Sequence, residues 1–94
     1  MNEVLEYLRS NNFESPAHIE RFSTYSGGRE VTVEVRDYGP TGGRSRYEVY
    51  AYFTDVPAEK RQLNASYVLG NSAGSVIDAL EEVGMHWDVF KPAN

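Results

Sequence analysis

The chain has 94 residues, of which 40% are hydrophobic and 24% are charged, and it contains no cysteine. This length suits one domain with a modest core and excludes folds that need about 200 residues or more, such as a TIM barrel. The composition is that of a globular protein, which excludes a disordered chain, a collagen-like repeat and a coiled coil. We therefore expect residues 1–94 to form a single domain.

The net charge of −5 is distributed unevenly along the chain. Residues 1–20 and 55–94 each sum to −3, whereas residues 21–54 sum to +1 and contain five arginines. Proteins that bind the phosphate backbone usually carry a basic domain, so the overall charge argues against general nucleic-acid binding. The arginines of the middle segment leave a local contact open, and the two ends predict an acidic surface.

The lack of cysteine excludes a disulfide framework and a thiolate metal site. Small secreted domains often need disulfides, so we expect a cytoplasmic protein. The chain opens without the basic and apolar regions that are typical of a signal peptide. Its longest apolar run, residues 49–53, is far shorter than the about 20 residues that cross a bilayer, so no membrane partner is expected.

The first two segments differ in how clearly they predict a structure. Residues 2–11 place Val4 and Leu8 one turn apart on a helical face, and their acidic start suits the helix dipole. Residues 17–25 fit a loose helical stripe, but their aromatic and β-branched side chains before a Ser-Gly-Gly turn favour a strand. We predict a helix for the first segment and a strand for the second, with a helix as its alternative.

Two strands with regular alternation follow. Residues 30–37 alternate valines with polar side chains, and residues 45–54 continue this period of two. The glycine-rich stretch 39–43 between them predicts a turn. The two segments therefore predict an antiparallel hairpin with its valines on one face.

The register of this hairpin can be argued from charge. A register with Val35 opposite Val49 sets Arg36 across from Glu48, which pairs opposite charges. Moving the strands by two residues would instead set Glu34 across from Glu48. Because opposite charges across a ladder stabilise it and like charges destabilise it, we predict the first register.

The C-terminal part predicts shorter elements. Residues 55–65 are polar and predict a loop, and residues 65–69 predict a short strand or an extended lead-in. Residues 76–83 predict a helix that Ser75 caps. Residues 86–90 form either a last short strand or a tail packed on the core.

Together these elements predict an α+β fold. We expect an antiparallel sheet of three or four strands with two short helices packed on it, in the order α-β-β-β-α, with an optional short C-terminal strand. The sequence shows no internal repeat and no linker, which is consistent with one domain.

One motif has the form of a catalytic element. Residues 70–74 match the glycine-x-serine-x-glycine pattern of serine hydrolases, with Ser72 as the nucleophile. The sheet of an α/β-hydrolase needs more than twice this length, and the better helix cap is Ser75, three residues further along. We therefore interpret the motif as a glycine-containing loop that leads into a capped helix.

The remaining titratable residues do not form a recognisable catalytic or metal site. His18 and His86 lie on distant segments, and two histidines are too few for a tetrahedral zinc. Asp78, Glu81 and Glu82 fall on the outer face of the C-terminal helix, where carboxylates are normally solvated. We expect no catalytic residue, no metal and no cofactor.

The seven tyrosines are the most unusual feature of the composition. Tyr50 and Tyr52 point away from the valine face of their hairpin and lie close to Arg36. Tyrosine and arginine are enriched at binding hot spots. This face is therefore a surface that binds a partner, a layer that the N-terminal helix covers, or a hybrid in which one tyrosine is covered and the other is exposed.

The same hairpin carries a basic tip. Arg44 and Arg46 flank the glycine-rich turn and, with Arg36, give an arginine-rich segment over residues 36–46. A β-ribbon with arginines can enter a DNA groove. The nearly balanced charge of residues 21–54 weakens this interpretation.

We therefore expect a small, acidic, non-enzymatic protein-interaction module of the cytosol. One concrete version is an inhibitor of the phage anti-defence type, a decoy whose acidic surface mimics nucleic acid. The alternatives are a nucleic-acid-binding accessory protein that uses residues 36–46 and a small serine hydrolase built on Ser72, and a homodimer is compatible with each. The residues expected to bind a partner are Arg36, Arg44, Arg46, Tyr50, Tyr52, Asp78, Glu81 and Glu82.

Overall fold

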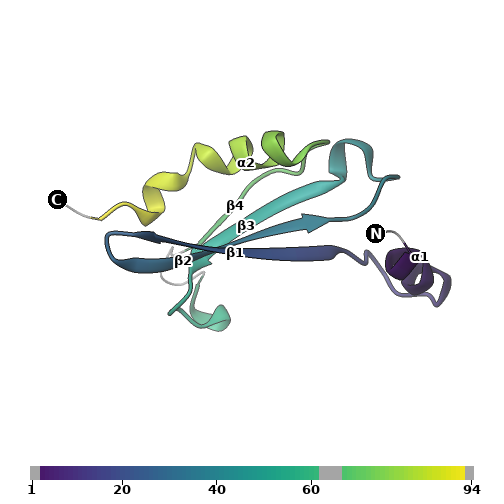
Figure 1. Cartoon of the computed structure of the whole chain (residues 1–94), viewed down its shortest axis with the longest axis horizontal. Helices are drawn as coiled ribbons and strands as arrows, with labels where there is room; N and C mark the ends of the chain where they lie inside the picture. The colour runs from purple at the N-terminus through teal and green to yellow at the C-terminus, as the bar shows by residue number, and fades with distance from the viewer. Residues whose placement is uncertain (1–2, 62–66, 93–94) are drawn as a thin grey trace.

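A computed structural model of the chain describes residues 3–61 and 67–92. These residues form a four-stranded antiparallel sheet in the order β1-β2-β3-β4, with one helix before it and one after it (Figure 1). The predicted α+β fold is confirmed. The strands and helices are β1 (His18–Ser26), β2 (Arg29–Asp37), β3 (Tyr47–Phe53), β4 (Tyr67–Leu69), α1 (Glu3–Ser10) and α2 (Val76–Gly84).

The segment for which we considered both a strand and a helix, residues 17–25, lies almost entirely in strand β1. β1 pairs with β2 along its whole length, from His18 opposite Asp37 to Ser26 opposite Arg29. The two-residue turn between them is Gly27-Gly28, with φ of 57° and 81°, and positive φ at both positions is the geometry that right-handed strand twist favours. The helical alternative for residues 17–25 is therefore wrong, because residues 18–26 pair with β2 across this turn.

The β2–β3 hairpin has the predicted register. Val35 lies opposite Val49 and Arg36 opposite Glu48, and Arg36 Nη1 donates to Glu48 Oε1 at 3.3 Å. β3 begins two residues later than predicted because a short 3₁₀ turn at Gly43–Ser45 ends the connection. Alternation and cross-strand charge were therefore sufficient to align these two strands.

Helix α2 packs on β3 and forms the main core with it. Ala79 and Val83 of the helix face Val49 and Ala51 of the strand, and all four side chains have no exposed surface. The predicted cap is confirmed, since the Ser75 hydroxyl accepts a hydrogen bond from the Asp78 amide at 3.1 Å. The helix ends at Gly84, one residue beyond the predicted segment.

The chain after α2 folds back onto the same core. Trp87–Phe90 forms a 3₁₀ helix, η3, and Phe90 is 5% exposed with its ring 5.1 Å from the Phe53 ring. The packed tail predicted for residues 86–90 is confirmed, and the strand alternative is wrong, because the segment coils to bring Phe90 inward. Ser26 fixes this end by donating to the Phe90 carbonyl at 2.6 Å.

The connection between β3 and β4 is in part a loop, as predicted. Its described portion contains one 3₁₀ turn at Ala58–Lys60. Residues 62–66 lie outside the described residues, and with them lie the last part of the predicted loop and the first two residues of the predicted strand at 65–69. The described part of that strand, β4, pairs with β3 from Tyr50 opposite Leu69 to Tyr52 opposite Tyr67.

Helix α1 lies at one end of the sheet and not on a face (Figure 1). Leu5 is 3% exposed and lies next to Gly39 in the turn after β2, and the Arg9 guanidinium donates to the Tyr38 carbonyl. Most of the helix surface, including Tyr7, is exposed. The alternative in which the N-terminal helix covers the tyrosine face is therefore wrong.

Candidate functional site

The two faces of the sheet are filled in different ways. Side chains alternate along a strand, so Val31, Val33 and Val35 of β2 point toward α2 while Thr32 and Glu34 point to the opposite face. We call the first the helix face and the second the polar face. A candidate site must lie on one of them, so each is described in turn.

A buried carboxylate organises the polar face. Glu34 is 6% exposed and accepts hydrogen bonds from three side chains. The hydroxyl of Tyr52 donates at 2.8 Å, Arg21 Nε at 3.1 Å and Arg36 Nη2 at 3.3 Å. We call these four residues the Glu34 network, and it holds a charge that burial would otherwise make costly.

The ionisation of Glu34 depends on these donors. Burial by itself would raise the pKa of this carboxyl, but the hydrogen bonds from Tyr52, Arg21 and Arg36 together hold it below its ordinary value. Burial and the hydrogen bond to Glu34 raise the pKa of Tyr52 in turn. The network therefore consists of a charged carboxylate and a neutral phenol at neutral pH.

The two tyrosines proposed to bind a partner are both part of this layer. Tyr52 is 7% exposed, and the Arg61 guanidinium lies 3.6 Å from the centre of its ring. Tyr50 is partly exposed, and its ring packs 5.2 Å from that of Tyr52 and 5.6 Å from that of Tyr67. Among the described residues, aromatic and arginine side chains therefore cover this part of the polar face.

The three arginines of the hairpin are placed in different ways. Arg36 is paired with Glu34 and Glu48 at 3.3 Å each. Arg46 makes two hydrogen bonds to the Asp37 carboxylate, at 2.8 and 3.1 Å, and this contact lowers the pKa of Asp37. Arg44 is exposed in the connecting turn.

The acidic residues of α2 lie on the outer face of the helix, as predicted. Asp78 and Glu81 are exposed and Glu82 is half-buried, all three away from the side that Ala79 and Val83 turn toward β3. They form an acidic outer face on the helix.

The cavity beside the serine of the hydrolase-like motif is lined by no described histidine. Ser72 is exposed and borders a cavity of about 550 Å³ together with Arg9, Tyr38 and Glu48, and the described residues that line it include no histidine. Gly70 serves packing, because a Cβ built on it would lie 2.6 Å from Val83 Cγ2. Within the described residues no group of three His, Cys, Asp or Glu side chains could hold a metal ion.

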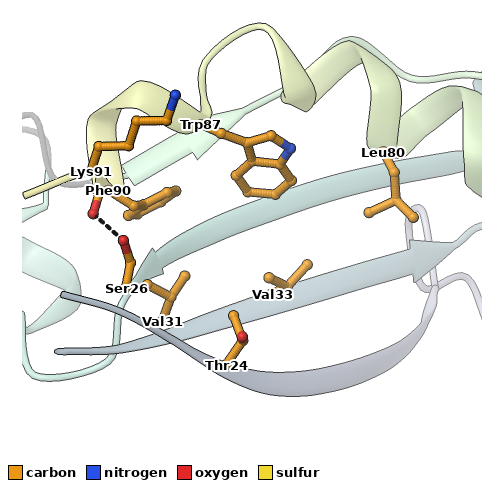
Figure 2. A pocket seen from close by; sticks show the side chains of 8 residues that line it. All are labelled: Thr24, Ser26, Val31, Val33, Leu80, Trp87, Phe90 and Lys91. Carbon is orange, nitrogen blue, oxygen red and sulfur yellow. Dashed lines mark hydrogen bonds between the residues drawn. The ribbon is translucent and has the colours of Figure 1, made fainter. Parts of the chain in front are cut away.

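The helix face, in contrast, contains an open apolar groove. Figure 2 shows Leu80 and Trp87 reaching from α2 and η3 toward Val33 of β2, with Val31 and Phe90 closing one end. This hollow has a volume of about 340 Å³, and Thr24, Ser26 and Lys91 complete its wall. Its surface is almost entirely apolar.

A second hollow continues the first along the strands. It measures about 250 Å³ and is lined by Phe22, Val35, Tyr47 and Val76, with polar groups from His18, Glu20 and Asp37 at its rim. We call the two hollows together the groove.

The groove exists because α2 is too narrow to cover the whole sheet. Helix α2 packs on β3, and η3 meets β1 at Ser26, whereas the helix-face side chains of β1 from His18 to Thr24 are exposed (Figure 1). Phe22 is consequently 53% exposed. A contiguous apolar surface of this kind marks an interaction site more often than an isolated exposed side chain does.

Sequence reasoning missed the groove. Thr24, Leu80 and Trp87 were not singled out, because each has an ordinary role in its own segment. One local signal was present: residues 20, 22 and 24 share a face of β1, and Glu20 and Thr24 are poor core residues. A strand with such a face indicates that nothing packs on it.

No protein-family model, curated protein or solved structure matches the chain. Among residues 3–61 and 67–92, no helix is both long and apolar enough to span a membrane.

Proposed function

We propose that this chain is a non-enzymatic protein-interaction module of the cytosol that holds apolar side chains of a partner protein in the groove. The observation that carries this proposal is the apolar hollow of about 340 Å³ between β2 and the α2–η3 segment. Binding hot spots form where large apolar or aromatic side chains enter such desolvated pockets. Trp87 and Phe90 supply the aromatic wall that this mode of binding uses.

The charge of the chain determines the kind of partner. The net charge is −5, and Glu20 is exposed at the rim of the second hollow. An acidic surface favours encounter with a basic partner and disfavours an acidic one. The partner segment that fits best carries bulky apolar side chains flanked by lysine or arginine.

The inhibitor or decoy version of the proposal uses a different surface. Asp78, Glu81 and Glu82 would present carboxylates to the basic groove of a nucleic-acid-binding protein. At 3.6 residues per turn, Asp78 and Glu82 point to the side of α2 away from Leu80, and hence away from the groove. The two versions can therefore be separated by substitution.

The nucleic-acid alternative has less support from the described contacts. Arg36 and Arg46 are already paired with carboxylates of their own sheet, which reduces the charge that they offer to phosphate. Arg44 is the exposed arginine of that group. A single exposed arginine gives a weak and mildly salt-dependent contact.

A displayed library of random peptides, selected on the whole chain, tests the proposal. We expect enrichment of peptides with aromatic or aliphatic anchors flanked by basic residues. Thr24→Arg places a charged side chain in the groove from an exposed strand position and should weaken a selected peptide about tenfold or more. Ser23→Arg is the matched control, because the neighbouring side chain points to the polar face.

Two results would count against groove binding. Peptides that bind Thr24→Arg as tightly as the unaltered chain would show that the groove is not the site. Loss of binding in a variant with Asp78, Glu81 and Glu82 all changed to the corresponding amides, with Thr24→Arg unaffected, would place the site on the acidic outer face of α2.

A further inference from the structure

Within residues 3–61 and 67–92, no strand pairs with the outer edge of β1. It is the terminal strand of the sheet, nine residues long, and residues 18–25 are all exposed. Edge strands expose unsatisfied backbone groups and pair readily with another chain unless charges, proline or a covering element block them. The middle of β1 carries none of these after Arg21, since the next five residues are Phe22-Ser-Thr-Tyr-Ser26.

The backbone groups that face this edge can be identified. The Thr54 amide donates to the Glu30 carbonyl, so the even-numbered residues of β2 direct their backbone groups to β3. The odd-numbered residues of β2 therefore bond β1, and through the observed register their partners are the even-numbered residues of β1. The free donors and acceptors thus belong to Ile19, Arg21, Ser23 and Tyr25.

We propose that a second copy of this chain binds β1 edge to edge, antiparallel, with the two-fold axis at Phe22. In this register Ile19 pairs with Tyr25 of the second copy and Arg21 pairs with its Ser23. Both are pairs of residues with free backbone groups, so each exchanges two hydrogen bonds. Phe22 then lies opposite Phe22 of the second copy in a closely spaced pair without hydrogen bonds.

The side chains favour this register over its neighbours. It pairs all nine residues of β1, and it brings together the exposed apolar groups Phe22 with Phe22 and Ile19 with Tyr25, which stabilises a ladder. An axis at Arg21 would oppose two arginines, and an axis at Glu20 would oppose two glutamates. An axis at Ser23 avoids like charges but leaves His18 and Ile19 without partners.

The proposed register tolerates the charges that remain. Glu20 lies opposite Thr24 of the second copy. Arg21 lies diagonally across from its own counterpart, but each Arg21 is held by Glu34 of its own sheet at 3.1 Å. The axis is perpendicular to the sheet, so the helix faces of both copies lie on the same side and the two grooves become neighbours across Phe22.

A single cysteine tests the axis directly, because the chain contains no other. In Phe22→Cys the two thiols would face each other about 4.5 Å apart at Cα, within the range that a disulfide spans. In Tyr25→Cys, at a position that is more exposed than Phe22, the thiols would be about 20 Å apart along the strands. Under mild oxidation of the dilute protein we expect a covalent dimer from the first variant and monomer from the second.

Charge complementation tests the same axis without a covalent bond. Phe22→Glu and Phe22→Lys should each sediment as monomers, because each opposes two like charges at the axis, and an equimolar mixture should sediment as a dimer. The unaltered chain should be dimeric at the same concentration. Cross-linking of Ser23→Cys in place of Phe22→Cys, a monomeric unaltered chain, or a dimer that persists in both charged variants would overturn the proposal.

Discussion

The two faces of the sheet use the same strands but are covered to different degrees. On the polar face, Glu34 and Tyr52 are buried beneath arginine and tyrosine side chains. On the helix face, α2 closes the part over β3 and leaves the part over β1 open, so that Phe22 is exposed. The residues that look most like a binding surface therefore stabilise the fold, whereas unremarkable valines and a threonine line the open surface.

The largest effect on stability is expected from the polar face. Tyr52→Ala removes a buried ring and a hydrogen bond to Glu34, and should lower the free energy of unfolding by about 3–5 kcal/mol. Thr24→Ala, on the open face, should change it by less than about 0.5 kcal/mol. Urea unfolding of both variants measures the difference. Equal and small effects would mean that the polar face is not a second core.

Replacing the carboxylate at the centre of the Glu34 network tests whether the polar face stabilises the fold, because the effect on stability should depend on pH. Glu34→Gln should cost about 1–3 kcal/mol at pH 7, because Arg21 and Arg36 lose their charged acceptor. The pKa of Glu34 is lowered in the fold, so its contribution is present above the ordinary carboxyl pKa of about 4.3 and is lost as the pH falls through the folded value.

The cost of Glu34→Gln should therefore shrink as the pH falls below the ordinary carboxyl pKa of about 4.3. Unfolding free energies at several pH values measure this, with Glu81→Gln, on the exposed face of α2, as the control that should show little change. A cost that is the same at pH 7 and pH 2.5 would show that Glu34 is not charged within its network.

The next largest loss of stability is expected where α2 lies close to the sheet, at Gly70. Gly70→Ala would place a Cβ 2.6 Å from Val83 Cγ2, and such overpacking typically costs about 1–3 kcal/mol. Gly74→Ala is the matched control, since its nearest neighbour is 3.4 Å away. In thermal unfolding, Gly70→Ala should have a lower Tm than Gly74→Ala. An equal Tm for both variants would mean that α2 can move to accept the extra methyl group without loss of stability.

The parts of the fold that were predictable depend on residues of one segment or of two strands that follow each other in the sequence. The β2–β3 register followed from alternation and from the charges of Arg36 and Glu48, which belong to adjacent strands. The Ser75 cap was predictable for the same reason, since its partner is three residues away.

The parts that were not predictable depend on how elements pack. The burial of Glu34 could not be predicted, because nothing near it in the sequence shows that Arg21 and Tyr52 converge on it. The groove depends on α2 lying over β3 and not over β1. Neither hydrophobic periodicity nor charge specifies this lateral position, so the most open part of the surface could not be inferred from the sequence.

The smallest effect on global stability is expected at α1, which lies outside both faces. Leu5→Ala removes the main buried side chain of this helix, whose described contacts include Gly39 and the Tyr38 carbonyl. We expect amide exchange in residues 3–10 to accelerate about tenfold, which corresponds to about 1.4 kcal/mol, and the free energy of global unfolding should fall by no more than this. A large loss of global stability would show that α1 belongs to the core.

The central claim, that the polar face stabilises the fold and the helix face binds, is tested most directly by two variants measured in parallel. Tyr52→Phe deletes a hydrogen bond to a charged group and should cost about 1.5–3 kcal/mol of stability while peptide affinity is retained. Thr24→Arg should keep its stability and lose about tenfold or more in affinity for the same selected peptide. The opposite pattern, with affinity lost in Tyr52→Phe at unchanged stability and retained in Thr24→Arg, would contradict the account.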